Sequence, residues 1–188
     1  MRPSAAPNCH KRGGNGRSDL PGSWVFRNAP DDLTTSNIAL GVLFPFVRSA
    51  AIYHCPADRS TVTDHEGLLR TRSYSLNWYL ASNAPKEYYT PRLKLRYSEI
   101  VSPGPSQVYA FIDEDDRTIN DGTFFSPQEF DRWGDLPAVR HALGSNLSFA
   151  DGHADRCESF CNSPRLSPYY FNAQLLVMGE NPISLFNC

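Results

Sequence analysis

Residues 141–155 read H-A-L-G-S-N-L-S-F-A-D-G-H-A-D, and this stretch predicts the hairpin on which the fold is built. Polar and apolar residues alternate over Asn146–Ala150, as in a strand with one buried face. Asp151-Gly152 follows, a dipeptide that favours a two-residue turn with both central residues at positive φ. We therefore expect the chain to return as an antiparallel strand over His153–Cys157.

Two further segments predict strands of the same sheet. Ser73–Asn77 alternates small polar with larger side chains, and Gln107–Ile112 is rich in β-branched and aromatic residues. Thr35–Asn37 is expected to cap a short helical turn over Ile38–Leu40. Convincing helical periodicity is otherwise scarce, and 15 prolines and 12 glycines interrupt the chain. The sequence thus predicts an α+β fold with an antiparallel β-sheet core and long loops.

Length and charge restrict the class of protein. A chain of 188 residues fits one globular domain, expected over 21–188, with residues 1–20 predicted to be a disordered N-terminal segment. The formal net charge of −2 gives no electrostatic basis for binding nucleic acid or an anionic membrane surface. Residues 1–20 lack the apolar core of a targeting signal. The most apolar region, residues 38–53, is too short to span a membrane, so no membrane contact is expected from this chain.

The five cysteines are too few for a disulfide-built scaffold. They stand at Cys9, Cys55, Cys157, Cys161 and Cys188. Two of the last three would form one bridge in an oxidising compartment, whereas unpaired thiols would behave as small apolar residues. The sequence leaves both alternatives open, together with the oligomeric state.

Carboxylates after the strand over Gln107–Ile112 are the best metal candidates. Asp113, Asp115 and Asp121 supply hard oxygen ligands that suit calcium, although the spacing is not that of an EF-hand. A solvated turn whose aspartates cap backbone N–H groups is the alternative we favour. We therefore expect no obligatory cofactor, with calcium as the one candidate.

Cys55-Pro56 beside His54 raises a second metal or thiol hypothesis. No other ligand pair at zinc spacing accompanies it, so we regard a reactive thiol or a metal ligand here as the minor interpretation.

An enzyme hypothesis rests on the histidines of the hairpin. His141, His153 and Asp155 are suitable ligands for the metal of a metal-dependent hydrolase, and Asp151 shares a strand face with the last two. Against it, Asp151 occupies a turn, and the chain contains no H-E-x-x-H helix, nucleophile elbow or phosphate-binding glycine loop. We expect instead that His141 hydrogen-bonds the Asp151 turn and that the protein is not an enzyme.

Several short motifs occur in order between residues 40 and 155. The H-x9-D-G frame is formed by His141, Asp151 and Gly152, and His153 follows it. Together they resemble the signature of prepilin-like proteins of planctomycetes and related bacteria, which are similar to pseudopilins of type II secretion and type IV pilus systems. The accompanying matches are G-x-L-x-P-F (41–46), Y-x-C-P-x-D (53–58, with Cys55, Pro56 and Asp58), R-S-x-S-x-N (72–77), F-I-D-E (111–114), I-N-D-G (119–122) and W-G-D-L-P-A (133–138).

The resemblance implies a pilin-like globular head that serves as a non-catalytic structural subunit. Its motif residues would have structural roles. Its partners would be other pilin or pseudopilin subunits, contacted through an N-terminal assembly helix that is absent from this chain. Its location would be the cell envelope or the exterior.

A secreted β-rich glycan-binding module is the main alternative function. Trp78, Tyr88, Tyr89 and Trp133 are aromatic side chains of the kind that stack on sugars, although the same residues are equally suited to a core.

Overall fold

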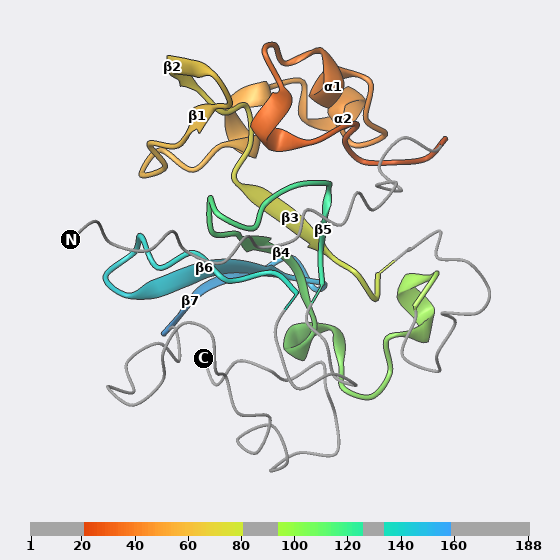
Figure 1. The fold of residues 1–188 in the computed structure, drawn as a ribbon. Helices are drawn as coiled ribbons and strands as arrows, with labels where there is room; N and C mark the ends of the chain where they lie inside the picture. Colours follow the sequence, from red (N-terminus) through yellow and green to blue (C-terminus); the bar gives the residue numbers. More distant parts are fainter. Residues whose placement is uncertain (1–20, 81–93, 126–133, 159–188) are drawn as a thin grey trace.

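The computed structural model describes residues 21–80, 94–125 and 134–158 (Figure 1). These residues form few, short helices and two sheets of mostly antiparallel strands, an architecture consistent with the predicted α+β class or with a mostly β fold. The predicted disordered segment 1–20 lies outside the described residues, as does most of the loop predicted over 82–97. No helix among the described residues is long and apolar enough to cross a membrane.

The larger sheet has five strands in the order β5-β3-β4-β6-β7. All neighbours pair antiparallel except β3 and β5, which run parallel. The strands predicted over 73–77, 107–112, 146–150 and 153–157 are therefore confirmed, with shifts of one or two residues at their ends. The strand bounds are β3 Tyr74–Asn77, β4 Tyr109–Asp113, β5 Thr123–Phe124, β6 Gly144–Phe149 and β7 Ala154–Glu158.

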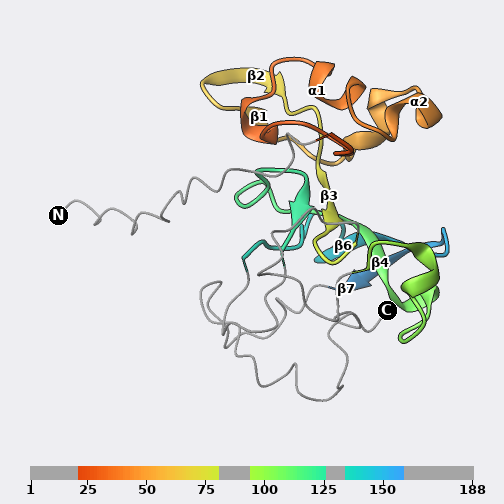
Figure 2. The ribbon, with the colours of Figure 1, turned by 90° about the vertical axis from the view of Figure 1, so that its right-hand side faces the viewer.

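Residues 21–69 form a second layer above this sheet (Figures 1 and 2). It contains short helices joined by turns and a two-stranded ribbon of β1 and β2. The predicted helical turn near residue 38 is confirmed as α1, but the predicted side-chain cap is wrong, because the helix begins at Ser36 and Thr35 makes no side-chain cap hydrogen bond. The elements are η2 Ala29–Asp31, α1 Ser36–Ala39, α2 Phe44–Val47, η3 Ala50–Tyr53, β1 Thr61–Val62 and β2 His65–Leu69; two further turns, η5 Tyr97–Glu99 and η6 Pro105–Gln107, precede β4.

The two layers meet in an aromatic core. Trp24 stacks on Tyr53 with ring centroids 5.6 Å apart and meets Phe111 of β4 edge-on at 4.9 Å. Val25 and Ile38 complete this buried cluster. The opposite face of the sheet carries a separate core of Tyr109, Ile112, Phe124 and Leu147. Both faces of the central strands are therefore buried, which leaves little of β3 and β4 to solvent.

Gly41 permits the close approach of two chain segments in the upper layer. A Cβ atom at this position would lie only 1.8 Å from the carbonyl oxygen of Trp24. The backbone N–H of Val42 donates to Ser23 O at 3.0 Å, which holds the two segments together. Only glycine fits here, and this gives a physical reason for the glycine of the G-x-L-x-P-F motif.

The hairpin between β6 and β7 is confirmed, but its predicted turn class is wrong. Gly152 has a φ of +95°, whereas Asp151 is absent from the described residues with positive φ. Gly152 N donates to Phe149 O at 3.0 Å, and Phe149 N donates to His153 O at 2.8 Å. These bonds define a three-residue loop in which a turn is followed by one left-handed glycine.

A turn with two positive φ angles does occur in the same stretch, nine residues earlier. Ala142 and Leu143 have φ of +48° and +64°, and His141 and Gly144 exchange two backbone hydrogen bonds around them. Neither residue is a glycine or asparagine, so the sequence lacks the usual signal for this conformation. The turn places His141 directly before β6.

Candidate functional site

The Cys55-Pro56-Ala57-Asp58 segment forms a tight turn after η3. Asp58 N donates to Cys55 O at 2.9 Å, and proline occupies the second turn position, where its fixed φ is favourable. The turn directs both of its ends toward β3. Ser73 Oγ donates to Asp58 Oδ2 at 2.5 Å and accepts from Cys55 N at 3.2 Å. The C-P-x-D motif is thus attached to the R-S motif.

His141 joins this turn to the end of β4. Its Nε2 atom lies 2.9 Å from Asp113 Oδ2 and 3.2 Å from Cys55 Sγ. The Asp113 side chain is fully buried, Cys55 is 1% exposed, and the His141 side chain is 22% exposed. We name Cys55, Asp113 and His141 the thiol–carboxylate–imidazole cluster. Three segments far apart in the sequence meet at this cluster.

Arg140 contacts the same cluster from the other side of the carboxylate. Its guanidinium donates to Asp113 Oδ1 and, at 3.2 Å, to Glu114 O. It also lies 3.7 Å from Asp58 Oδ1. One largely buried cation is therefore shared by two buried carboxylates, and Ser145 Oγ additionally donates to Asp113 O at 2.9 Å.

Burial determines the electrostatics of the cluster. It raises the pKa of Cys55 and of Asp113, although the charges of Arg140 and His141 act in the opposite direction on the carboxyl. Burial, together with the adjacent thiol and carboxylate, also raises the pKa of Tyr74. The pKa of Asp58 is instead lowered, because hydrogen bonds from Ser73 and Ser60 and the charge of Arg140 outweigh its burial.

The cluster does not have the geometry of a thiol protease relay. Such a relay needs the thiol at one imidazole nitrogen and the carboxylate at the other, so that a proton passes across the ring. Here both groups approach the same nitrogen, Nε2. A nucleophilic cysteine also needs a lowered pKa and access to substrate, whereas Cys55 is buried and its pKa is raised. The arrangement is better suited to fixing the fold or to holding an ion.

Two further buried ionisable side chains lie close to the cluster in the chain, one next to Asp113 and one next to Ser73. Arg72 and Glu114 are both fully buried and attract each other electrostatically. Arg72 donates to Asn120 O at 2.7 Å and to Arg27 O at 3.3 Å, which ties the segment just before β3 to two loops. Burial, and then the charge of Asp135, raise the pKa of Glu114 well above its usual value.

The predicted contact between His141 and Asp151 is wrong. Asp151 accepts a hydrogen bond from His153 N and lies 2.6 Å from His153 Nδ1, and the His153 ring stacks on Phe149. His141 is held by Asp113 instead. The hydrolase ligand set of His141, His153 and Asp155 is likewise not assembled, since the described residues contain no metal-capable group that combines them.

The calcium ligands predicted in the acidic loop also do not converge. Asp113 contacts Arg140 and His141. Asp115 accepts hydrogen bonds from Nε and Nη2 of Arg117, and Asp121 accepts one from the Thr123 hydroxyl. Within the described ranges, the thiol–carboxylate–imidazole cluster is the one set of three candidate ligands whose atoms all lie within 4.8 Å of one another. The capping role preferred for Asp121 is confirmed by its acceptance from Thr123 N at 2.8 Å.

A mostly apolar cavity of about 690 Å³ lies between the two layers. Trp24, Tyr53, Tyr74 and Phe111 line it, and the polar edge is formed by residues of β6 and β7. Of the aromatic residues proposed to stack on sugars, Trp78 packs edge-on against Phe125 at 5.4 Å and is half-buried. Tyr88, Tyr89 and Trp133 lie outside the described residues.

Sequence reasoning missed the convergence of the motifs. Cys55 and His141 are separated by 86 residues, and Asp113 and His141 by 28, so no local spacing indicates a common site. Each residue belongs to its own motif, and only the pairing of β4 with both β3 and β6 brings the motifs together. The side chains of Cys157 and the other three cysteines lie outside the described part, and Cys55 is a free, buried thiol.

No family model, curated protein or solved structure matches this chain.

Proposed function

We propose that this protein is a non-catalytic structural subunit of the pseudopilin type, the globular head of a subunit in a type II secretion or type IV pilus-like assembly. The observation that carries this proposal is that the motif residues serve as internal contacts of the fold. Cys55, Asp58, Asp113, Arg140 and His141 contact one another rather than an open cleft. They connect the upper layer to β4 and to the turn before β6, and contacts of this kind stabilise a fold.

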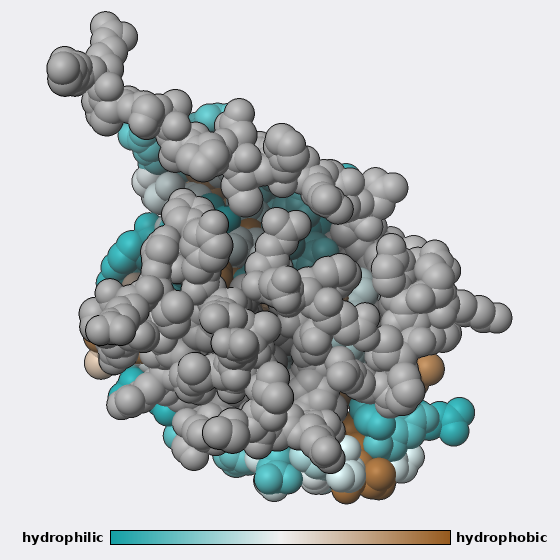
Figure 3. Space-filling model, turned by 60° about the horizontal axis from the view of Figure 1, so that its bottom comes forward, coloured by the Kyte–Doolittle hydropathy of each residue, from teal (hydrophilic) through white to brown (hydrophobic). Residues whose placement is uncertain are grey.

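Exposed apolar side chains on the upper layer support a role in assembly. Phe46 of α2 is 84% exposed and Ile52 of η3 is 57% exposed, and Leu40 and Val42 are also exposed in the segment between α1 and α2. Apolar side chains that gather on a surface mark contacts with other proteins more often than they serve the monomer. On the face drawn in Figure 3, turned away from α1 and α2, the visible described residues mix hydrophilic and hydrophobic types.

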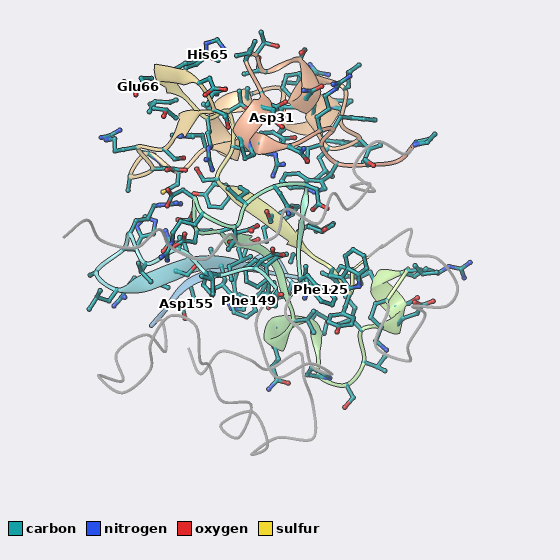
Figure 4. All side chains as sticks on the ribbon, viewed as in Figure 1. Asp31, His65, Glu66, Phe125, Phe149 and Asp155 are labelled. Atoms are coloured by element: carbon teal, nitrogen blue, oxygen red, sulfur yellow. The ribbon has the colours of Figure 1, made fainter. Side chains whose placement is uncertain are left out.

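Site-specific photo-crosslinking tests this proposal. The protein, expressed at native level from its complete gene in its own host, would carry the photoreactive residue in the substitution Phe46→p-benzoylphenylalanine. The matched control carries the photoreactive residue at His65, an exposed residue of β2 that lies far from the five-stranded sheet (Figure 4). We expect Phe46 to yield crosslinked species at multiples of the chain mass in the envelope fraction, and His65 to yield few.

Two results would overturn the proposal. One is a soluble monomer that crosslinks to nothing from either position. The other is retention of the purified protein on an immobilised polysaccharide together with an absence of self-crosslinking, which would favour the glycan-binding alternative. The half-buried Trp78 supplies little free ring surface for that alternative among the described residues.

A further inference from the structure

The thiol–carboxylate–imidazole cluster brings three potential metal-ligand atoms within 4.8 Å of one another. His141 Nε2 either carries a hydrogen and donates it, or lacks one and accepts. When it donates to Asp113 Oδ2 at 2.9 Å, it cannot also accept from the Cys55 thiol 3.2 Å away, and the thiol then shares the Asp113 carboxylate with His141. Both neighbours nevertheless point at the same atom from two buried positions. A cation placed between the three atoms satisfies all of them at once.

We propose that Cys55, Asp113 and His141 bind one zinc ion. Thiolate sulfur, imidazole nitrogen and carboxylate oxygen are the three ligand types that zinc accepts in proteins. Calcium and magnesium prefer oxygen ligands alone, so a buried thiol argues against them. This inference does not depend on the proposed structural function and concerns a different property of the motif residues.

The distances fit zinc after a small outward movement. Zinc–sulfur bonds of about 2.3 Å and zinc–nitrogen or –oxygen bonds of about 2.0 Å place tetrahedral ligand atoms roughly 3.3–3.6 Å apart. The observed separations of 3.2 Å for sulfur to nitrogen and 2.9 Å for nitrogen to oxygen are a few tenths of an ångström shorter. Rotation of the partly exposed His141 ring supplies this expansion. The same exposure admits a fourth ligand from solvent.

The surrounding charges balance a divalent cation. The thiolate of Cys55 and the carboxylate of Asp113 carry two negative charges toward the ion. Arg140 is matched by Asp58, which lies 3.7 Å from it. Arg140 also occupies Oδ1 of Asp113 and leaves Oδ2 facing Cys55 and His141. Such outer contacts orient a ligating carboxylate and are typical of protein metal sites.

Cobalt and zinc binding to the complete chain tests the proposal. Metal-stripped protein is titrated with cobalt chloride, and zinc content is measured after dialysis against zinc chloride. We expect the parent to bind one more equivalent of metal than Cys55→Ser and to show a thiolate-to-cobalt charge-transfer absorption that Cys55→Ser lacks. His141→Gln should weaken zinc binding at least about 10-fold. The matched control His153→Gln, which alters an exposed histidine outside the cluster, should bind as the parent does.

X-ray absorption at the zinc edge of the parent gives a measurement that needs no variant. We expect one sulfur together with nitrogen and oxygen ligands around the ion. Absence of metal from folded parent protein, equal metal content in the parent and Cys55→Ser, or a shell with no sulfur or with two or more would each overturn the proposal. If Cys55→Ser fails to fold, the absorption spectrum of the parent still decides.

Discussion

His141 Nε2 lies 2.9 Å from Asp113 Oδ2, and this contact joins the turn before β6 to the buried end of β4. Asp113 is the antiparallel partner of Tyr74, so the contact also reaches β3. The H-x9-D-G frame therefore works in two separate places. Its histidine holds the centre of the sheet, while its Asp-Gly pair shapes the exposed hairpin loop. Different consequences are expected when each is changed.

His141→Ala should destabilise the protein by about 1.5–3 kcal/mol, the range for a hydrogen bond to a charged group. The substitution leaves the buried Asp113 carboxylate with one partner fewer. Urea-induced unfolding in the presence of a chelator measures this effect apart from any bound metal. His153→Ala is the matched control, and its exposed side chain should contribute about 0.5 kcal/mol or less. Equal effects of the two substitutions would contradict the assignment.

Arg140→Met should cost about 3–5 kcal/mol, because it leaves two buried carboxylates without their cation. Arg117→Met removes another arginine–aspartate pair, but the Arg117 side chain is 62% exposed, so a loss below about 1 kcal/mol is expected. Thermal and urea unfolding of both variants compare them directly. A loss from Arg117→Met as large as that from Arg140→Met would show that burial does not set the difference.

Asp135→Asn should stabilise the protein at neutral and higher pH. Burial, and to a lesser degree the charge of Asp121, raise the pKa of Asp135 to about 7. The folded state therefore retains a proton that the unfolded state releases near pH 4, and stability falls as the pH rises from about 4 to about 7. Asparagine cannot ionise, and its amide oxygen still accepts the bond that Phe125 N donates at 2.6 Å.

The expected gain for Asp135→Asn at pH 8 is at most about 4 kcal/mol, since each pKa unit corresponds to about 1.4 kcal/mol. Unfolding free energies between pH 4 and pH 8 should show a shallower fall than in the parent. Part of the slope should remain, because the neighbouring Glu114 also has a raised pKa. An unchanged slope would contradict the assignment of Asp135.

Gly152→Val should destabilise the hairpin by about 1–2 kcal/mol through backbone conformation alone. Gly152 has a φ of +95°, and a Cβ atom there would meet nothing within 4 Å, so crowding does not contribute. Gly104→Val is the control, since its φ of −70° is accessible to any residue and the space around it is equally open. The melting temperature should fall only for the change at residue 152.

Ala142→Asn combined with Leu143→Gly should stabilise the protein, by roughly 1 kcal/mol for each strained residue relieved. Both positions have positive φ, which Asn-Gly adopts readily. Leu143 is 51% exposed, so little buried surface is lost with its side chain. An unchanged or lower melting temperature for the double variant would show that this turn is not strained.

Local pattern was sufficient for much of the sheet. Alternating polar and apolar residues before Asp151 predict β6, because strand side chains repeat every second residue. β-Branched and aromatic residues before Asp113 predict β4. The positive φ predicted for Gly152 is confirmed, since that preference belongs to the residue itself. Turn class was less predictable. Asp151-Gly152 occurs in more than one kind of hairpin loop, and the hydrogen bonds across the strands select among them.

The sequence by itself determined four strands of the larger sheet, β3, β4, β6 and β7, but not β1, β2 or β5. Only the tertiary structure decided that His141 meets Asp113 and Cys55 rather than Asp151. Helical and strand periodicity act over a few residues, whereas this contact depends on strand order and register across an interval of 86 residues. Tertiary structure also decided that Asp113, Asp115 and Asp121 of the acidic loop do not share one metal site. Each carboxylate takes the partner that its own strand or turn presents, because a buried charge is stable only beside a compensating group.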